Sequence, residues 1–101
     1  MTSFILTSQA ERDLDQILDY LVEDSIEAAG RVWDAIEQAF GRLAKMPHMG
    51  HFREDLADKR HKFFQVYSYL IVYRFQTKPL QIVRVLHTSR DAHALLSLIS
   101  A

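Results

Sequence analysis

Two basic side chains lie at and just past the end of the apolar run that covers residues 80–87. Residues 80–87 are rich in β-branched residues, which favours a strand, and His87 and Arg90 lie three positions apart at its end. Cations of this kind can hold a phosphate or a partner's carboxylate, and a histidine can also move protons. The simpler interpretation is structural. His87 would then be half-buried and bonded to Arg90, Asp91 or the main chain, and Ser89 or Asp91 would cap a following helix.

Arg84 is a charged residue inside this apolar run. Strict alternation along a strand would place it on the same face as Leu80, Ile82 and Leu86. A buried guanidinium without an anion is costly. We therefore expect that Arg84 reaches solvent, pairs with an acid of a helix, or receives a carboxylate from a partner protein. Arg74, which follows Tyr73 in the preceding run, has the same alternatives.

The charges are distributed unevenly, although the net charge is −1. Residues 1–45 hold nine acids and four bases, a net charge of −5, whereas residues 46–101 hold eight bases and four acids, a net charge of +4. Such a division can create a positive face that recruits an anionic partner. Two oppositely charged halves that pack on each other would explain it equally well.

Helical periodicity predicts two helices in the first half. After a short strand at residues 3–7, Ser8-Gln-Ala-Glu11 has the form of a capping box, so the first helix begins there. Asp24-Ser-Ile-Glu27 repeats the signal, and the second helix begins near residue 25 and ends before Pro47. Two helices joined by almost no loop form an αα-hairpin.

The pattern of the second half predicts a loop and three strands. Residues 47–60 lack a period, and strands follow at residues 62–67, 69–75 and 80–87, with turns near residues 67–68 and 76–79. A short helix over residues 91–99 ends the chain. The predicted fold class is therefore α+β: an N-terminal strand, an αα-hairpin, then an antiparallel sheet of three further strands and the short C-terminal helix. We expect all strands to join in one antiparallel sheet, with the hairpin on one face.

Length and composition bound the class of protein. A chain of 101 residues with 49% hydrophobic residues fits a single domain over residues 1–101 with a proper core. The absence of cysteine excludes disulfides and thiolate metal sites and suits a reducing compartment. Neither a signal peptide nor an apolar run of about 18 residues is evident, so we expect a soluble cytoplasmic protein with no membrane contact.

Four short patterns occur in a recognisable order along the chain. They are Ala10-x-x-Asp13-Leu14-x-x-Ile17-x-x-Tyr20, Leu43-x-x-x-Pro47-x-x-Gly50, Tyr69-x-Ile71-x-Tyr73-Arg74 and Ile82-x-x-Val85-x-His87-x-x-Arg90-Asp91. Their order and spacing over nearly the whole chain resemble the RelE/ParE toxin superfamily. The chain is most similar to the ParE-like, or plasmid stabilisation, branch of type II toxin–antitoxin systems.

This resemblance implies a function. ParE-like toxins lack a catalytic set and inhibit DNA gyrase by binding that favours a cleaved-DNA state. The expected partner is a cognate ParD-like antitoxin, whose acidic C-terminal segment neutralises the toxin in a hetero-oligomer, and no cofactor is expected. The candidate partner-binding residues are Trp33, Arg60, Lys62, Arg74, Arg84, His87 and Arg90.

The alternative function is a RelE-like, ribosome-dependent mRNA endonuclease. Its catalytic residues would be Arg60, Arg74, Arg84 and His87, with His93 as a further proton carrier. The chain has no terminal Tyr or Lys of the kind such enzymes use, which favours the gyrase hypothesis. The third alternative is an interaction domain without toxicity. It would form a tight complex with its partner and have neither toxic effect.

The side chains of His48-x-x-His51, with Glu54 and Asp55 nearby, are of types that can bind a metal ion. The spacing of these residues does not form a firm four-ligand pattern, and we predict no metal.

Overall fold

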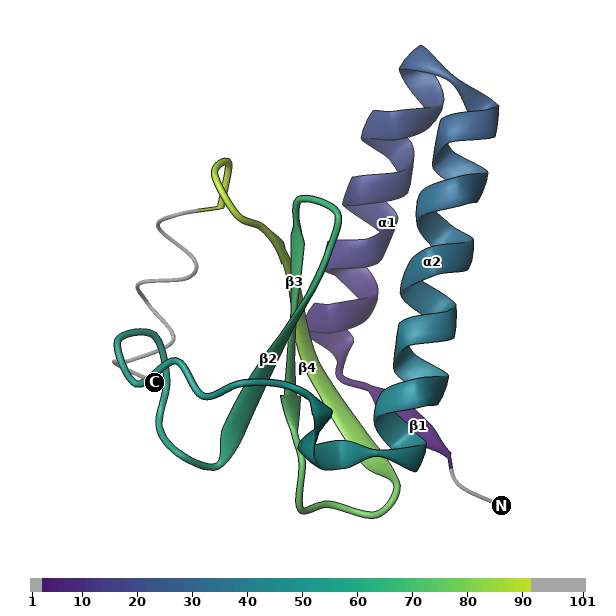
Figure 1. Ribbon diagram of the computed structural model, residues 1–101. Helices are drawn as coiled ribbons and strands as arrows, with labels where there is room; N and C mark the ends of the chain where they lie inside the picture. Colours follow the sequence, from purple (N-terminus) through teal and green to yellow (C-terminus); the bar gives the residue numbers. More distant parts are fainter. Residues whose placement is uncertain (1–2, 92–101) are drawn as a thin grey trace.

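The computed structural model describes residues 3–91, and its elements follow the predicted order (Figure 1). Strand β1 (Phe4–Leu6) leads into the helices α1 (Ser8–Asp24) and α2 (Ile26–Lys45). A short 3-10 helix, η1 (Pro47–Met49), and a loop precede the strands β2 (His61–Val66), β3 (Tyr69–Arg74) and β4 (Leu80–His87). The predicted C-terminal helix lies outside the described residues.

Both long helices begin at a hydroxyl cap. The Thr7 side chain accepts a hydrogen bond from the Ala10 N–H at 3.1 Å, and Ser25 does the same for Ala28 at 3.1 Å. The prediction of a cap at Ser8 was wrong by one residue, because the Thr7 hydroxyl also donates to the Val83 carbonyl of β4 at 2.8 Å. Ser25 alone separates the helices, so they form the predicted αα-hairpin. Among the described residues, none of these helices is long and apolar enough to span a bilayer.

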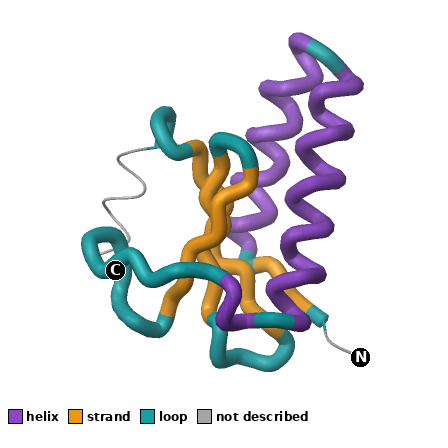
Figure 2. Tube along the Cα trace, in the orientation of Figure 1, coloured by secondary structure: helices purple, strands orange, loops and turns teal. Residues whose placement is uncertain are grey.

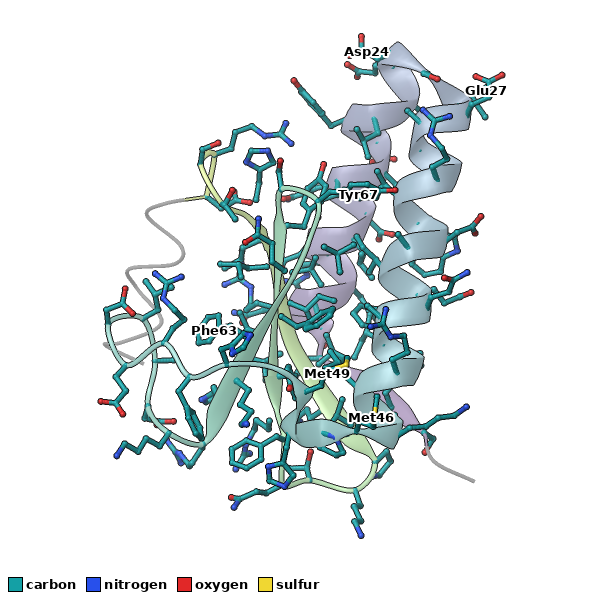
Figure 3. All side chains as sticks on the ribbon, in the orientation of Figure 1. Asp24, Glu27, Met46, Met49, Phe63 and Tyr67 are labelled. Carbon is teal, nitrogen blue, oxygen red and sulfur yellow. The ribbon has the colours of Figure 1, made fainter. Side chains whose placement is uncertain are left out.

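The helical hairpin covers one face of a four-stranded sheet (Figure 2). Apolar residues of both helices, among them Leu14, Ile36, Phe40 and Leu43, pack with Ile71 and other residues of that face. A second, smaller core lies on the opposite face, where the loop before β2 contributes Leu56 and Ala57. Phe63 belongs to this second core (Figure 3). Apolar contacts on both faces explain why nearly all of β3 is buried.

The sheet has the strand order β1-β4-β3-β2. The three later strands pair antiparallel, as predicted. The prediction that every pair would be antiparallel was wrong for β1, which pairs with β4 in parallel. Tight turns force β2, β3 and β4 to alternate in direction, whereas β1 is connected through the whole helical hairpin and is free of that constraint.

A bulge in β4 changes the face of the residues that follow it. Tyr73 of β3 pairs with Ile82 and Val72 pairs with Arg84, which leaves Val83 as an extra residue. Ile82 therefore belongs to the helix-side core, whereas Leu86 belongs to the second core. The expectation that Arg84 shares one face with Leu80, Ile82 and Leu86 was wrong, because it assumed unbroken alternation.

The Leu-x-x-x-Pro-x-x-Gly pattern is explained by contacts with the buried Tyr73. Its hydroxyl donates to the Pro47 carbonyl at 2.7 Å and accepts from the Gly50 N–H at 2.9 Å. A Cβ atom on residue 50 would lie 2.8 Å from the Phe63 carbonyl oxygen and 2.9 Å from Cε1 of Tyr73. Glycine is therefore required at position 50 by close packing, and the segment after α2 is fixed to the sheet.

Candidate partner-binding site

A groove of about 220 Å³ lies between α1 and the C-terminal end of β4. We call it the α1–β4 groove. Three of the seven candidate residues from the sequence, Arg84, His87 and Arg90, line it together. Helix α1 contributes Asp13, Gln16 and Tyr20 to the opposite wall. In the sequence, Asp13 and Tyr20 stood out only as parts of a helical pattern, and their place in this site was not predicted.

Arg84 and Asp13 form a bidentate ion pair at one side of this groove. Nε of Arg84 lies 2.8 Å from Oδ2 of Asp13, and Nη2 lies 3.0 Å from Oδ1. The hydrogen bonds to Asp13 raise the pKa of Arg84 above its ordinary value. Of the three alternatives for Arg84, the structure selects pairing with a helix acid. Oδ2 of Asp13 also accepts from the Val85 N–H at 3.0 Å and so covers the edge of β4 beyond the short β1.

His87 organises the turn that follows β4. Its Nδ1 accepts from the backbone N–H groups of Ser89 and Arg90 at 3.2 and 3.0 Å, which places the ring proton on Nε2 in the neutral form. The His87 N–H donates to the Asp91 carboxylate at 2.7 Å. The ring also packs edge-on against Tyr69, with the centroids 5.4 Å apart. The structural interpretation of His87 therefore agrees with its contacts, and its side chain fixes the position of Arg90.

Arg90 is the exposed cation of the groove. Its guanidinium carbon lies 4.1 Å from the centre of the Tyr20 ring, within the range of a cation–π contact. Within residues 3–91, no carboxylate lies at ion-pair distance from Arg90. Stacking on a ring leaves the edge of a guanidinium available, so Arg90 can still donate to an external carboxylate.

The other basic candidates lie away from this groove. Arg60 is exposed and forms a salt bridge to Asp58 at 2.6 Å. The pKa of Asp58 is held far below its usual range, mainly by Arg60. Arg74 is at the far end of β3, opposite His61, and none of the carboxylates in the described part of the chain forms a salt bridge to it.

Lys62 is buried, and the contacts of its ammonium group are with other residues of the fold. Its ammonium group donates to the carbonyl oxygens of His48 and Gly50 at 3.1 and 3.4 Å. It lies 4.8 and 5.2 Å from the centres of the Phe52 and Phe75 rings. Arg74 and His87, both members of the alternative catalytic set, are far apart. Tyr69 pairs with His87, and the strand length from Arg74 to Tyr69 is roughly 17 Å.

Trp33 lines a second groove, of about 270 Å³, on the opposite side of α1. This Trp33 groove is formed with Leu6, Leu14 and Leu18, and the acids Glu11 and Asp15 lie at its margin. Trp33 is only partly buried, so part of its indole remains open to a partner.

The histidine pair His48 and His51 has contacts of other kinds. The His48 ring packs against Phe75, with the centroids 5.3 Å apart, and the His51 backbone exchanges two hydrogen bonds with Phe63 of β2. In residues 3–91, no three His, Cys, Asp or Glu side chains are grouped so that they could hold a metal ion.

Comparison with known proteins identifies the family of the chain. None of the curated proteins matches the chain. A solved structure described as "Chromosomal ParDE TA system from P. aeruginosa" matches with a TM-score of 0.70 and 24% identity, over 88% of this chain and 98% of that one, which shows a shared fold. Residues 4–92 match the family profile described as "ParE toxin of type II toxin-antitoxin system, parDE". The chain belongs to the ParE toxin family of type II toxin–antitoxin systems.

Proposed function

We propose that the chain is a cytoplasmic toxin that inhibits DNA gyrase by binding to it. A cognate antitoxin neutralises the toxin. The observation that supports this most strongly is the family match over residues 4–92. The mechanism would be preferential binding to one state of the target, the state in which gyrase has cleaved its DNA.

The α1–β4 groove supports binding of an acidic antitoxin segment. Arg90 presents a guanidinium whose neighbour is the Tyr20 ring, and within residues 3–91 no acid forms an ion pair with it. A carboxylate from a second chain would gain a charge-assisted hydrogen bond there. The Trp33 groove offers a partly exposed aromatic anchor on the other side of α1, where an apolar part of the same antitoxin would be buried. The expected assembly is a hetero-oligomer of toxin and antitoxin.

The positions of the cations favour a binding function over RNA cleavage. Nucleolytic chemistry requires several cations around one scissile phosphate, together with a group that moves protons. Arg60 is paired with Asp58, Arg84 is paired with Asp13, and Nδ1 of His87 already accepts two N–H bonds. Arg74 lies at the opposite end of the sheet from His87.

Induced expression of the chain alone in bacteria tests this proposal. We expect growth arrest with filamentation and DNA-damage signalling, and rescue when the neighbouring antitoxin reading frame is expressed with it. Mapping of transcript ends in the same cells separates the alternatives. Cuts within translated codons would contradict the proposal in favour of a ribosome-dependent nuclease, and normal growth with folded protein present would contradict toxicity.

A further inference from the structure

A single atom, Nδ1 of His87, is the acceptor around which the turn after β4 closes. It lies 3.0 Å from the backbone nitrogen of Arg90 and 3.2 Å from that of Ser89. The Ser89 hydroxyl also lies 3.2 Å from this atom. Only a ring nitrogen without a proton can accept the two backbone bonds, so this form of the turn requires neutral His87.

The contacts of this turn determine where the cation of the α1–β4 groove lies. His87 binds the backbone N–H of Arg90. At the other end of the same side chain, the guanidinium carbon lies 4.1 Å from the centre of the Tyr20 ring in α1. Arg90 is therefore held at both ends, with its charge at the wall of the groove.

We propose that neutral His87 holds Arg90 in the position that receives a carboxylate of the antitoxin, and that protonation of His87 weakens antitoxin binding. This inference rests on the proposed function, in which an acidic antitoxin segment binds in the α1–β4 groove. His87 is then a positioning residue, because it acts through Arg90 and need not touch the antitoxin.

Protonation removes the acceptor at Nδ1. An imidazolium carries a proton on both ring nitrogens, so Nδ1 would face the N–H groups of Ser89 and Arg90 as a second donor. Both backbone groups would lose their partner. The bonds of the His87 backbone to Asp91, at 2.7 and 3.1 Å, do not involve the ring. We therefore expect the turn to loosen around Ser89 and Arg90 while β4 remains paired.

The charges around the ring of His87 cancel one another. Among residues 3–91, the titratable and charged side chains that line the groove with it or contact its ring are Asp13 and Tyr20 of α1, Tyr69 of β3, Arg84 of β4, and Arg90 and Asp91 of the turn. Asp13 is paired with Arg84, and the charge of Asp91 is opposite to that of Arg90. The hydrogen bonds of Nδ1 are therefore the local contacts that a proton on the ring changes most.

Two substitutions of His87 separate the role of the acceptor from that of the proton. The amide oxygen of asparagine lies two bonds from Cβ, as Nδ1 does, and it accepts hydrogen bonds without titrating. At pH 8, His87→Asn should bind the antitoxin from the neighbouring reading frame as the parent does. His87→Ala should bind it about tenfold more weakly, measured by calorimetry.

The pH profile of binding tests the effect of the proton. Histidine side chains change their charge between pH 8 and pH 5. Over this interval the affinity of the parent should fall about tenfold more than that of His87→Asn, which reports the titration of all other groups, those of the antitoxin included. If His87→Ala does not fold, the profiles of the parent and of His87→Asn still give this comparison.

A double substitution tests whether His87 acts through Arg90. Arg90→Ala should weaken binding about tenfold, and His87→Ala added to it should weaken binding little further, because the two residues serve one interaction. The inference is overturned if the parent and His87→Asn lose affinity equally on acidification, or if Arg90→Ala binds as the parent does. A parent protein that does not bind the antitoxin at pH 8 is a separate result, which would refute the proposed function itself.

Discussion

At the level of single residues, the ion pair between Arg84 and Asp13 connects α1 to β4. Their side chains are 18% and 11% exposed, so neither charge is fully hydrated. Removal of one partner leaves the other charge partly buried without compensation, which costs more than the pair itself contributes. We expect Asp13→Asn to lower the free energy of unfolding by about 3 kcal/mol, measured by urea denaturation.

A matched exposed pair provides the control for this prediction. Arg60 also donates two hydrogen bonds to the carboxylate of Asp58, both to Oδ2, but these side chains are 66% and 47% exposed. Asp58→Asn should have a much smaller effect, because water replaces the lost partner. Equal effects of the two asparagine substitutions would show that burial of the Arg84–Asp13 pair has no energetic importance.

The close packing around Gly50 leads to a second prediction about single residues. An added Cβ would contact the Phe63 carbonyl and the Tyr73 ring. Gly50→Ala should therefore destabilise the fold by about 1–3 kcal/mol, as overpacking does. Gly30 lies in the interior of α2, and apart from its chain neighbours and the backbone of its own helix no atom lies within 4 Å of its Cβ position. Gly30→Ala should stabilise by about 0.5–1 kcal/mol in the same thermal or urea melts. A destabilising Gly30→Ala would show that the space around residue 30 is not open.

The buried phenol of Tyr73 predicts a pH dependence. Burial raises the pKa of Tyr73 above its ordinary value of 10.0, and the hydrogen bond from Gly50 offsets part of that rise. Its contribution to stability is thus complete below pH 10 and is lost as the pH rises above it, because the unfolded chain ionises first.

Comparison with Tyr73→Phe measures this contribution. At neutral pH the substitution should cost about 1–3 kcal/mol, since the Pro47 carbonyl and the Gly50 N–H lose their partner. As the pH rises from about 10 to about 11, the difference in unfolding free energy between parent and variant should shrink. A difference that stays constant over that interval would mean that Tyr73 does not ionise differently in the two states.

At the level of elements, periodicity and end signals were sufficient to predict both helices, the loop and all four strands. The apolar stripe of α1 and the proline after α2 are local features, and local features are visible in a sequence. The bulge at Val83 was not predicted, because it contains no glycine and depends on pairing with β3. The parallel pairing of β1 also depends on tertiary packing, and strand direction has no local signal.

The turn after β4 leads to a prediction about antitoxin binding. Arg90→Glu reverses the exposed cation of the α1–β4 groove and should weaken antitoxin binding by about tenfold or more, measured by calorimetry or pull-down. Arg74→Glu makes the same charge change at the other end of the sheet and should have a smaller effect. If Arg74→Glu weakens binding more than Arg90→Glu does, the antitoxin uses the far end of β3 instead.

At the level of the whole molecule, the charge asymmetry of the sequence is retained in the fold. Of the salt bridges formed within residues 3–91, Arg84–Asp13 joins the acidic first part to the basic second part, and the others lie within residues 53–61. Within the described residues, the two parts therefore neutralise each other through this one ion pair only. Arg90, which forms no ion pair within residues 3–91, remains available to a partner of opposite charge.

The candidate site was only partly predictable from the sequence. The pattern at residues 82–91 identified Arg84, His87 and Arg90, which the structure brings into one groove. Lys62 was also a candidate, although its ammonium group is enclosed by carbonyl oxygens and aromatic rings. Which strand residues meet the helices, and which are buried by a loop, depends on contacts between distant segments, and a single sequence does not specify these contacts.

The most direct test of the proposed function uses purified toxin with DNA gyrase and supercoiled or relaxed plasmid. The toxin alone should inhibit supercoiling and increase the amount of cleaved DNA held by gyrase, and pre-incubation with the antitoxin should abolish both effects. Unchanged supercoiling at a toxin concentration that arrests growth when reached in cells would contradict the proposal that this chain acts by binding gyrase.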